Sequence, residues 1–167
     1  MADNETEGIS QWAVAVTLTG LVVAVLSPYL GALADQGGLR RRFLMISTGI
    51  CVTSIAVMFF PGEGQVVFAR TVFTLSSIAF ELGQLFYNAY LPDLAPPSAI
   101  GRVSGFGWGA EHIGGLLCLV MALFGFVQAN APLFGFSTEA CEHVRATNLL
   151  VAIWVGLFAL PLFLWTG

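Results

Sequence analysis

Six polar side chains recur every three or four residues within one long apolar stretch, residues 66–91; they are Arg70, Thr74, Ser77, Glu81, Gln84 and Asn88. At about 100° per residue of an α-helix, all six fall within an arc of roughly 80°. If the stretch crosses a membrane, a charge near its centre costs at least about 2.5 kcal/mol, so Glu81 is expected to face protein or water. The pattern favours a pathway or binding face for a polar solute.

A structural role for the same residues is the alternative. In that interpretation Glu81 is protonated and hydrogen-bonded to a neighbouring helix. Ser77 and Thr74 then donate their hydroxyl hydrogens back to their own helix backbone. The number of polar residues on one face favours the pathway interpretation.

A second group of titratable residues lies about two turns into another apolar stretch, residues 103–128. Glu111 and His112 are adjacent there, and both are residue types that exchange protons, so they are candidates for proton coupling. Adjacent helical residues point about 100° apart, so the two side chains do not face one partner in the same way. In the alternative, one lines a wet crevice and the other binds a polar group of a neighbouring helix.

Three glycines four residues apart, Gly101, Gly105 and Gly109, precede this pair. Small residues at this spacing let the backbone of another helix approach closely. The pattern indicates helix packing, and it does not by itself indicate movement.

The sequence lacks the patterns of common hydrolytic and metal sites. It contains no HExxH or CxxC spacing and no glycine-serine nucleophile elbow. Glu142 and His143 are more typical of a solvated pair than of a metal site, and Cys51, Cys118 and Cys141 cannot all pair. We expect no enzymatic activity, no metal and no cofactor, with an intramembrane enzyme as the alternative.

The amino-acid composition indicates the class of protein to which these polar and titratable residues belong. Of the 167 residues, 57% are hydrophobic and only 10% are charged, too few to coat a water-soluble globule. The apolar excess excludes intrinsic disorder, and a net charge of -4 without any lysine excludes nucleic-acid binding. An all-α integral membrane protein in contact with the lipid bilayer is therefore expected.

Five segments have roughly the 20 apolar residues that a spanning helix needs. The predicted spans are residues 11–33, 43–60, 66–91, 103–128 and 147–166, which together form one transmembrane bundle over 11–166. Residues 1–10 form an acidic leader before the first span. Ala32-Leu33-Ala34 resembles a signal-peptide cleavage site, but the acidic leader and the long apolar run argue against cleavage.

The arginines predict the orientation of the bundle. Arg40, Arg41, Arg42 and Arg102 fall in connections on one side, and Arg145 falls in a connection on the other. Because short arginine-rich loops stay in the cytoplasm, the N-terminus with its leader is expected outside and the C-terminus inside. We expect a multi-pass protein of the bacterial inner membrane.

Two blocks of sequence resemble the major facilitator superfamily. GALADQGGLRR, residues 31–41, is similar to the cytoplasmic loop between the second and third helices of these transporters. Residues 80–93 and 101–108 resemble the vacuole-effluxer-like branch, whose fungal members export amino acids from the vacuole. The likeness runs from about residue 12 to residue 166 and aligns the five spans with helices two to six.

The resemblance implies a partial N-terminal six-helix bundle that lacks its first helix, from a transporter built of two such halves. As partners it implies that first helix and a second six-helix half or another copy of the chain. It places the helix at 66–91 in the cavity wall. Asp35 and Arg41, in a loop that also contains Gly31 and Gly38, would latch the two halves. Simple topology and a tight turn are the alternative explanation of this loop.

The expected function is membrane transport of a small polar solute by alternating access, with amino-acid efflux and proton coupling as finer hypotheses. Glu81, Gln84 and Asn88 would contact the solute, and Arg70 would lie nearer the outer mouth. The branch usually has Gly-Tyr where this chain has Glu111-His112, which strengthens the hypothesis of proton coupling. The alternative is a non-transporting membrane scaffold or a truncated transporter remnant, in which the glycine pattern serves only assembly.

Overall fold

Five long α-helices make up most of the protein. The computed structural model describes residues 5–37, 39–62, 64–129, 133–138 and 141–165. The helices are α1 (Glu5–Gly37), α2 (Arg40–Val57), α3 (Val66–Leu94), α4 (Ile100–Ala122) and α5 (Glu142–Trp165). A π-helical turn, Leu123–Val127, continues α4, and a short 3-10 turn, Leu133–Gly135, follows it. Within the described residues there is no strand, which confirms the predicted all-α fold.

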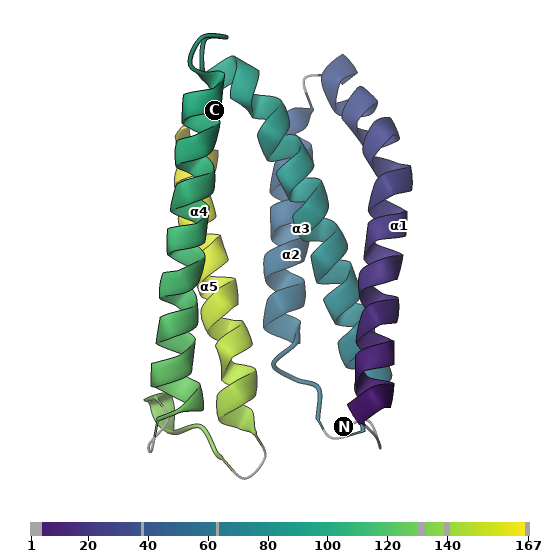
Figure 1. The fold of residues 1–167 in the computed structure, drawn as a ribbon, viewed down its shortest axis with the longest axis vertical. Coiled ribbons are helices and arrows are strands. Elements are labelled where there is room, and N and C mark those ends of the chain that lie inside the picture. Colours follow the sequence, from purple (N-terminus) through teal and green to yellow (C-terminus); the bar gives the residue numbers. More distant parts are fainter. Residues whose placement is uncertain (1–4, 38, 63, 130–132, 139–140, 166–167) are drawn as a thin grey trace.

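Consecutive helices run up and down through the bundle (Figure 1). The α1–α2 and α3–α4 connections lie at one end, and the α2–α3 and α4–α5 connections lie at the other. Arg40, Arg41, Arg42 and Arg102 therefore share one end of the molecule, which we call the arginine-bearing end. Arg145 lies near the opposite end.

Four helices are long and apolar enough to cross a membrane: α1, α3, α4 with its π-helical turn, and α5. The second helix, α2, has 18 residues and begins with three arginines, so its apolar part is shorter. Each of the five predicted spans overlaps one of the five helices. Their ends differ by up to six residues, at Glu5, where α1 begins, and at Ala122, where the α-helical part of α4 ends. Helices continue into polar flanks because backbone hydrogen bonding, rather than hydropathy, sets where a helix ends.

The short helix α2 packs between α3 and α5. Its buried face consists of Leu44, Ser47, Cys51 and Ser54. The two helices are in close contact there, because an added Cβ at Gly83 of α3 would lie at an ordinary van der Waals distance, 3.8 Å, from the Ser47 Cβ. Small residues at such contacts are the usual means by which membrane helices pack closely.

The most deeply buried large side chain among the described residues is Phe86 of α3, which is 1% exposed. It contacts Ala34 of α1 and Leu44 of α2, and its ring stacks on Phe43 with centroids 5.2 Å apart. One aromatic ring therefore joins three helices near the arginine-bearing end.

Arginines of α2 bind the ends of three other helices. Arg40 forms an ion pair with Asp35 of α1, with Nη2 and Oδ1 2.7 Å apart, and its Nη1 donates to the Ala89 carbonyl of α3 at 3.1 Å. Arg41 instead donates from Nη2 to the Phe163 carbonyl of α5 at 2.7 Å. The two consecutive arginines therefore point to different helices, since Asp35 of α1 pairs with Arg40 and Arg41 binds α5.

The opposite end has its own connections between α5 and the α2–α3 turn. Arg145 Nη1 donates to the Pro61 carbonyl at 2.8 Å, and its guanidinium lies 5.9 Å from the centroid of the Phe59 ring. Asn148 Nδ2 donates to the Met58 carbonyl at 3.4 Å. Arg145 is thus part of the packing as well as a marker of topology.

Candidate functional site

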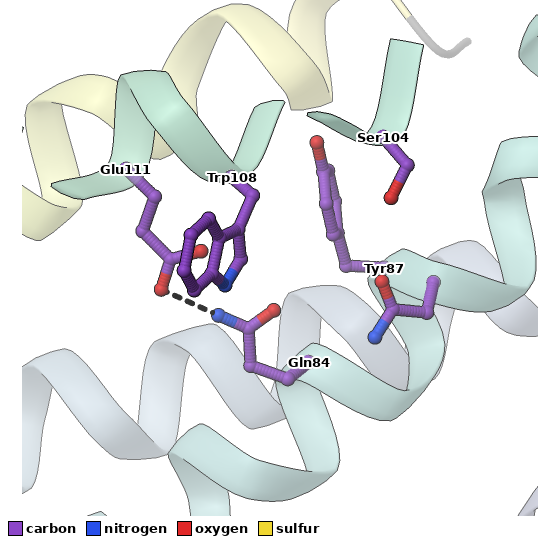
Figure 2. Close-up of a pocket in the computed structure, with 6 residues that line it drawn as sticks. Gln84, Tyr87, Ser104, Trp108 and Glu111 are labelled. Atoms are coloured by element: carbon purple, nitrogen blue, oxygen red, sulfur yellow. Dashed lines mark hydrogen bonds between the residues drawn. The ribbon is translucent and has the colours of Figure 1, made fainter. Parts of the chain in front are cut away.

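A small pocket lies between α3 and α4, with a volume of about 250 Å³. Its lining consists of polar and aromatic side chains from both helices: Gln84, Tyr87, Asn88, Ser104, Trp108 and Glu111. Figure 2 shows Glu111 and Trp108 reaching from α4 towards α3, and Gln84 and Tyr87 reaching from α3 towards α4. Asn88 and Glu111 are both exposed, so the pocket is open to its surroundings.

Helical spacing explains why these six residues meet. The α4 residues lie at i, i+4 and i+7, and the α3 residues lie at i, i+3 and i+4. Each set occupies one face of its helix because residues three and four apart are surface neighbours. The pocket forms where the two faces oppose each other.

The Gln84–Glu111 pair lies well inside both helices. Glu111 follows the start of α4 at Ile100 by 11 residues, and Gln84 precedes the end of α3 at Leu94 by 10 residues. At 1.5 Å per residue, both side chains are about 15 Å from the arginine-bearing end. If this end of the two helices lies at one face of a bilayer, the pair is well inside the hydrocarbon core, which is about 30 Å thick.

A hydrogen bond between Gln84 and Glu111 crosses the pocket. Gln84 Nε2 donates to Glu111 Oε1 at 3.0 Å (Figure 2). With its amide nitrogen used in this way, Gln84 leaves its amide oxygen as an acceptor. The bond joins the predicted polar face of α3 to the titratable pair predicted on α4.

Tyr87 approaches α4 at a glycine. A Cβ atom added at Gly107 would lie 3.1 Å from the Tyr87 hydroxyl oxygen, closer than side-chain contacts normally come. Glycine at this position therefore allows the phenol to reach the α4 backbone.

Glu111 and His112 have different surroundings. Glu111 lines the pocket, whereas His112 is absent from its lining. His112 Nδ1 lies 2.9 Å from the Trp108 carbonyl oxygen and donates to it, and the His112 ring lies against the Trp108 indole, with centroids 4.0 Å apart. His112 therefore contacts a pocket residue from outside the pocket.

The remaining predicted residues of α3 do not reach the pocket. Glu81 is exposed one turn away from Gln84, while Ser77 and Arg70 are half-buried. Thr74 Oγ1 donates to the Arg70 carbonyl at 2.9 Å, which is the backbone hydrogen bond of the structural alternative. The structure thus brings Gln84 and Asn88 together with Glu111 and leaves the other four along the helix.

The predicted gating residues that the structure describes do not form one cluster either. Asp35 is bound to Arg40, and Arg41 is bound to α5. Gly31 lies within α1 with no neighbouring atom near its Cβ position, and Gly38 lies outside the described residues.

Sequence reasoning missed three pocket residues: Tyr87, Ser104 and Trp108. A usable signal was the spacing on α4, since Ser104 and Trp108 lie seven and three residues before Glu111. Searching that helix for residues on the face of its carboxylate would have found both. Tyr87 was hidden because it lies between the buried and the polar faces of α3.

The glycines Gly101, Gly105 and Gly109 face open space. A Cβ atom added at any of them meets no other atom within 4 Å. The packing contact that their spacing predicts is therefore not made within the described residues.

Comparison with known proteins gives the family. Residues 2–119 match the profile described as Major Facilitator Superfamily. The chain is 28% identical over 149 residues to the uncharacterized MFS-type transporter YxiO of Bacillus subtilis (strain 168), an alignment that covers 88% of the chain and 34% of the relative. The chain thus spans about a third of the length of that curated relative. No solved structure matches the chain.

These findings confirm the superfamily predicted from residues 31–41, whereas the vacuole-effluxer-like branch stays a prediction. Four apolar helices and the family together make this a multi-pass integral membrane protein. Because the profile match covers more than half of its residues, the chain belongs to the Major Facilitator Superfamily of membrane transporters.

Proposed function

We propose that the pocket between α3 and α4 is a solute site of a secondary transporter that works by alternating access. The observation that supports this most directly is the Gln84–Glu111 hydrogen bond across the pocket, about 15 Å from the arginine-bearing end of both helices. A carboxylate near the midplane is costly unless it faces protein or water, and here it faces a polar pocket. This chain is then the transporting part of the molecule, with no enzymatic activity.

The other polar residues of α3 extend the proposed route away from the arginine-bearing end. Glu81 follows Gln84 by one turn in that direction, Ser77 and Thr74 come next, and Arg70 lies about 21 Å from Gln84 at 1.5 Å per residue. These residues would meet a solute after it leaves the pocket. Thr74 contributes little in this structure because its hydroxyl is bound to its own helix.

Proton coupling and gating are finer parts of the proposal. Glu111 is the stronger candidate for carrying a proton because it lines the pocket, and His112 would act on it through Trp108. The Asp35–Arg40 pair, with Arg41 bound to α5, would hold the ends of the helices together in one state of the cycle. Amino-acid efflux remains a hypothesis that rests on the resemblance to the vacuole-effluxer-like branch.

Orientation and partners complete the proposal. With the arginine-bearing end in the cytoplasm of a bacterial cell, the N-terminus lies outside and the C-terminus inside. The open glycine face of α4 supports contact with a further helix, supplied by a first helix, a second half or another copy of the chain. If that face serves assembly alone, the chain is a non-transporting scaffold. Flux measurements distinguish a scaffold from a transporter.

The test is solute flux into proteoliposomes that contain the chain, measured with a panel of isotope-labelled amino acids, amines, sugars and organic acids. We expect flux of at least one class, with a loss of tenfold or more in Gln84→Leu and a smaller loss in Glu81→Gln. Thr53→Val serves as the control, because Thr53 is exposed on α2 and its hydroxyl is bound to the Gly49 carbonyl.

Two outcomes would contradict the proposal at different levels. Undiminished flux in Glu81→Gln would remove that residue from the route and leave the pocket in place. Undiminished flux in Gln84→Leu, or no flux with a chain that is fully inserted, would favour the scaffold.

A further inference from the structure

We infer that the pocket between α3 and α4 selects small primary ammonium ions and disfavours solutes that carry a carboxylate. This inference rests on the proposed function, because it names the solute class of the same site. It departs from the amino-acid hypothesis, since a zwitterion carries both charges.

The charge of the lining is the first support. Glu111 is the one carboxylic acid in the lining, and no arginine or histidine belongs to it. Glu111 Oε1 is used by Gln84, whereas Oε2 has no hydrogen-bond partner among the described residues. A cation is attracted to this carboxylate and an anion is repelled.

Aromatic rings are the second support. Trp108 and Tyr87 both line the pocket, from opposite helices. A cation over an aromatic face is attracted by the ring quadrupole, most strongly by tryptophan. The indole is also held in place, because the His112 ring lies against it.

The hydrogen-bonding groups distinguish a primary ammonium from other cations. Such a group has three N–H donors and no acceptor. The pocket offers carboxylate, amide and hydroxyl oxygens from Glu111, Gln84, Asn88 and Ser104. A quaternary ammonium has no N–H to donate, so these acceptors would lose water without gaining a partner.

Size sets the last limit. The volume of about 250 Å³ lies below the roughly 300 Å³ at which pockets for drug-sized ligands begin. A short alkyl chain with one ammonium group matches this volume, whereas a large organic cation would extend beyond the lining residues.

The experiment compares matched solutes by equilibrium dialysis against the detergent-solubilised full chain. Isotope-labelled butylammonium is the probe. Unlabelled butanol, norvaline and butyltrimethylammonium compete with it; they respectively remove the charge, add a carboxylate and remove the N–H donors. We expect butylammonium to bind at least tenfold more tightly than each of the three.

Variants assign the preference to the pocket. Glu111→Gln should reduce the preference for butylammonium over butanol to twofold or less, while Glu142→Gln, at the start of α5 and outside the pocket, should keep it. Circular dichroism checks that each variant keeps its helix content. Glu111→Asp, which retains the charge, should restore part of the preference.

The outcomes separate this inference from the proposed function. If norvaline or butanol competes as well as butylammonium and binding still depends on Gln84, the ammonium inference is overturned while the solute site stands. Equal competition by butyltrimethylammonium overturns the assignment to primary amines. If butylammonium does not bind while Gln84-dependent flux of another solute class is observed, the inference is again overturned and the transporter remains.

Discussion

The two sides of α3 differ in what they contact. Towards α2, the helix is packed through Phe86 and Gly83, with small side chains between the backbones. Towards α4, it presents Gln84 and Asn88 to a pocket. We call these the packed side and the open side of α3. A membrane helix that both supports the fold and contacts a solute can divide the two tasks between opposite faces, and single substitutions should then affect one task and spare the other.

The largest effect is expected on the packed side. Phe86→Ala should lower the free energy of unfolding by about 3–5 kcal/mol, because it leaves a cavity among three helices. Asn88→Ala, two residues later and exposed on the open side, should change it by about 0.5 kcal/mol or less. Unfolding in mixed detergent micelles measures both, and similar losses in the two variants would show that the division is wrong.

A smaller effect is expected from the contact that joins α2 to α5. Arg41→Met should cost about 1 kcal/mol of stability, because it removes the hydrogen bond to the Phe163 carbonyl. Arg42 provides the matched control, being adjacent and exposed. If Arg42→Met destabilises the protein as much as Arg41→Met, the positive charge at this end of the bundle contributes to stability and the Arg41–Phe163 hydrogen bond does not.

The smallest effect is expected on the open side, at the glycine beside Tyr87. Gly107→Ala should displace the phenol by a few tenths of an ångström and weaken solute binding about two- to fivefold, which is less than about 1 kcal/mol. Gly105→Ala meets no neighbouring atom and should leave binding unchanged. Equilibrium dialysis with butylammonium measures the effect of both substitutions. If Gly105→Ala weakens binding as much as Gly107→Ala, the contact between Tyr87 and Gly107 does not contribute to solute binding.

The sequence was sufficient for the helices and for part of the pocket. Apolar length located all five helices, and periodicity on α3 identified Gln84 and Asn88 as members of one polar face. The choice of Glu111 as a functional candidate came from its charge in an apolar stretch. These features are local, because they depend on the composition and spacing of a single helix.

Features that depend on two helices could not be predicted from the sequence. Periodicity placed all six polar residues of α3 on one face and did not distinguish among them. Only Gln84 and Asn88, which lie opposite α4, line the pocket. The same limit applies to Arg40 and Arg41, since the direction of each consecutive arginine depends on which helix end lies nearby. Helix ends were also uncertain because hydropathy changes gradually there.

The hydrogen bonds at the two ends of α5 determine which motions of the bundle are costly. Arg41 binds its last turn and Asn148 binds the end of α2 near its first turns, so α2 and α5 are joined near both termini. Sliding one helix along the other by a single turn, about 5.4 Å, would break both bonds at once. Tilting α4 would break neither bond and would stretch the Gln84–Glu111 contact instead. The helix that carries the carboxylate can therefore tilt without breaking the bonds between α2 and α5, and such a tilt would change the pocket directly.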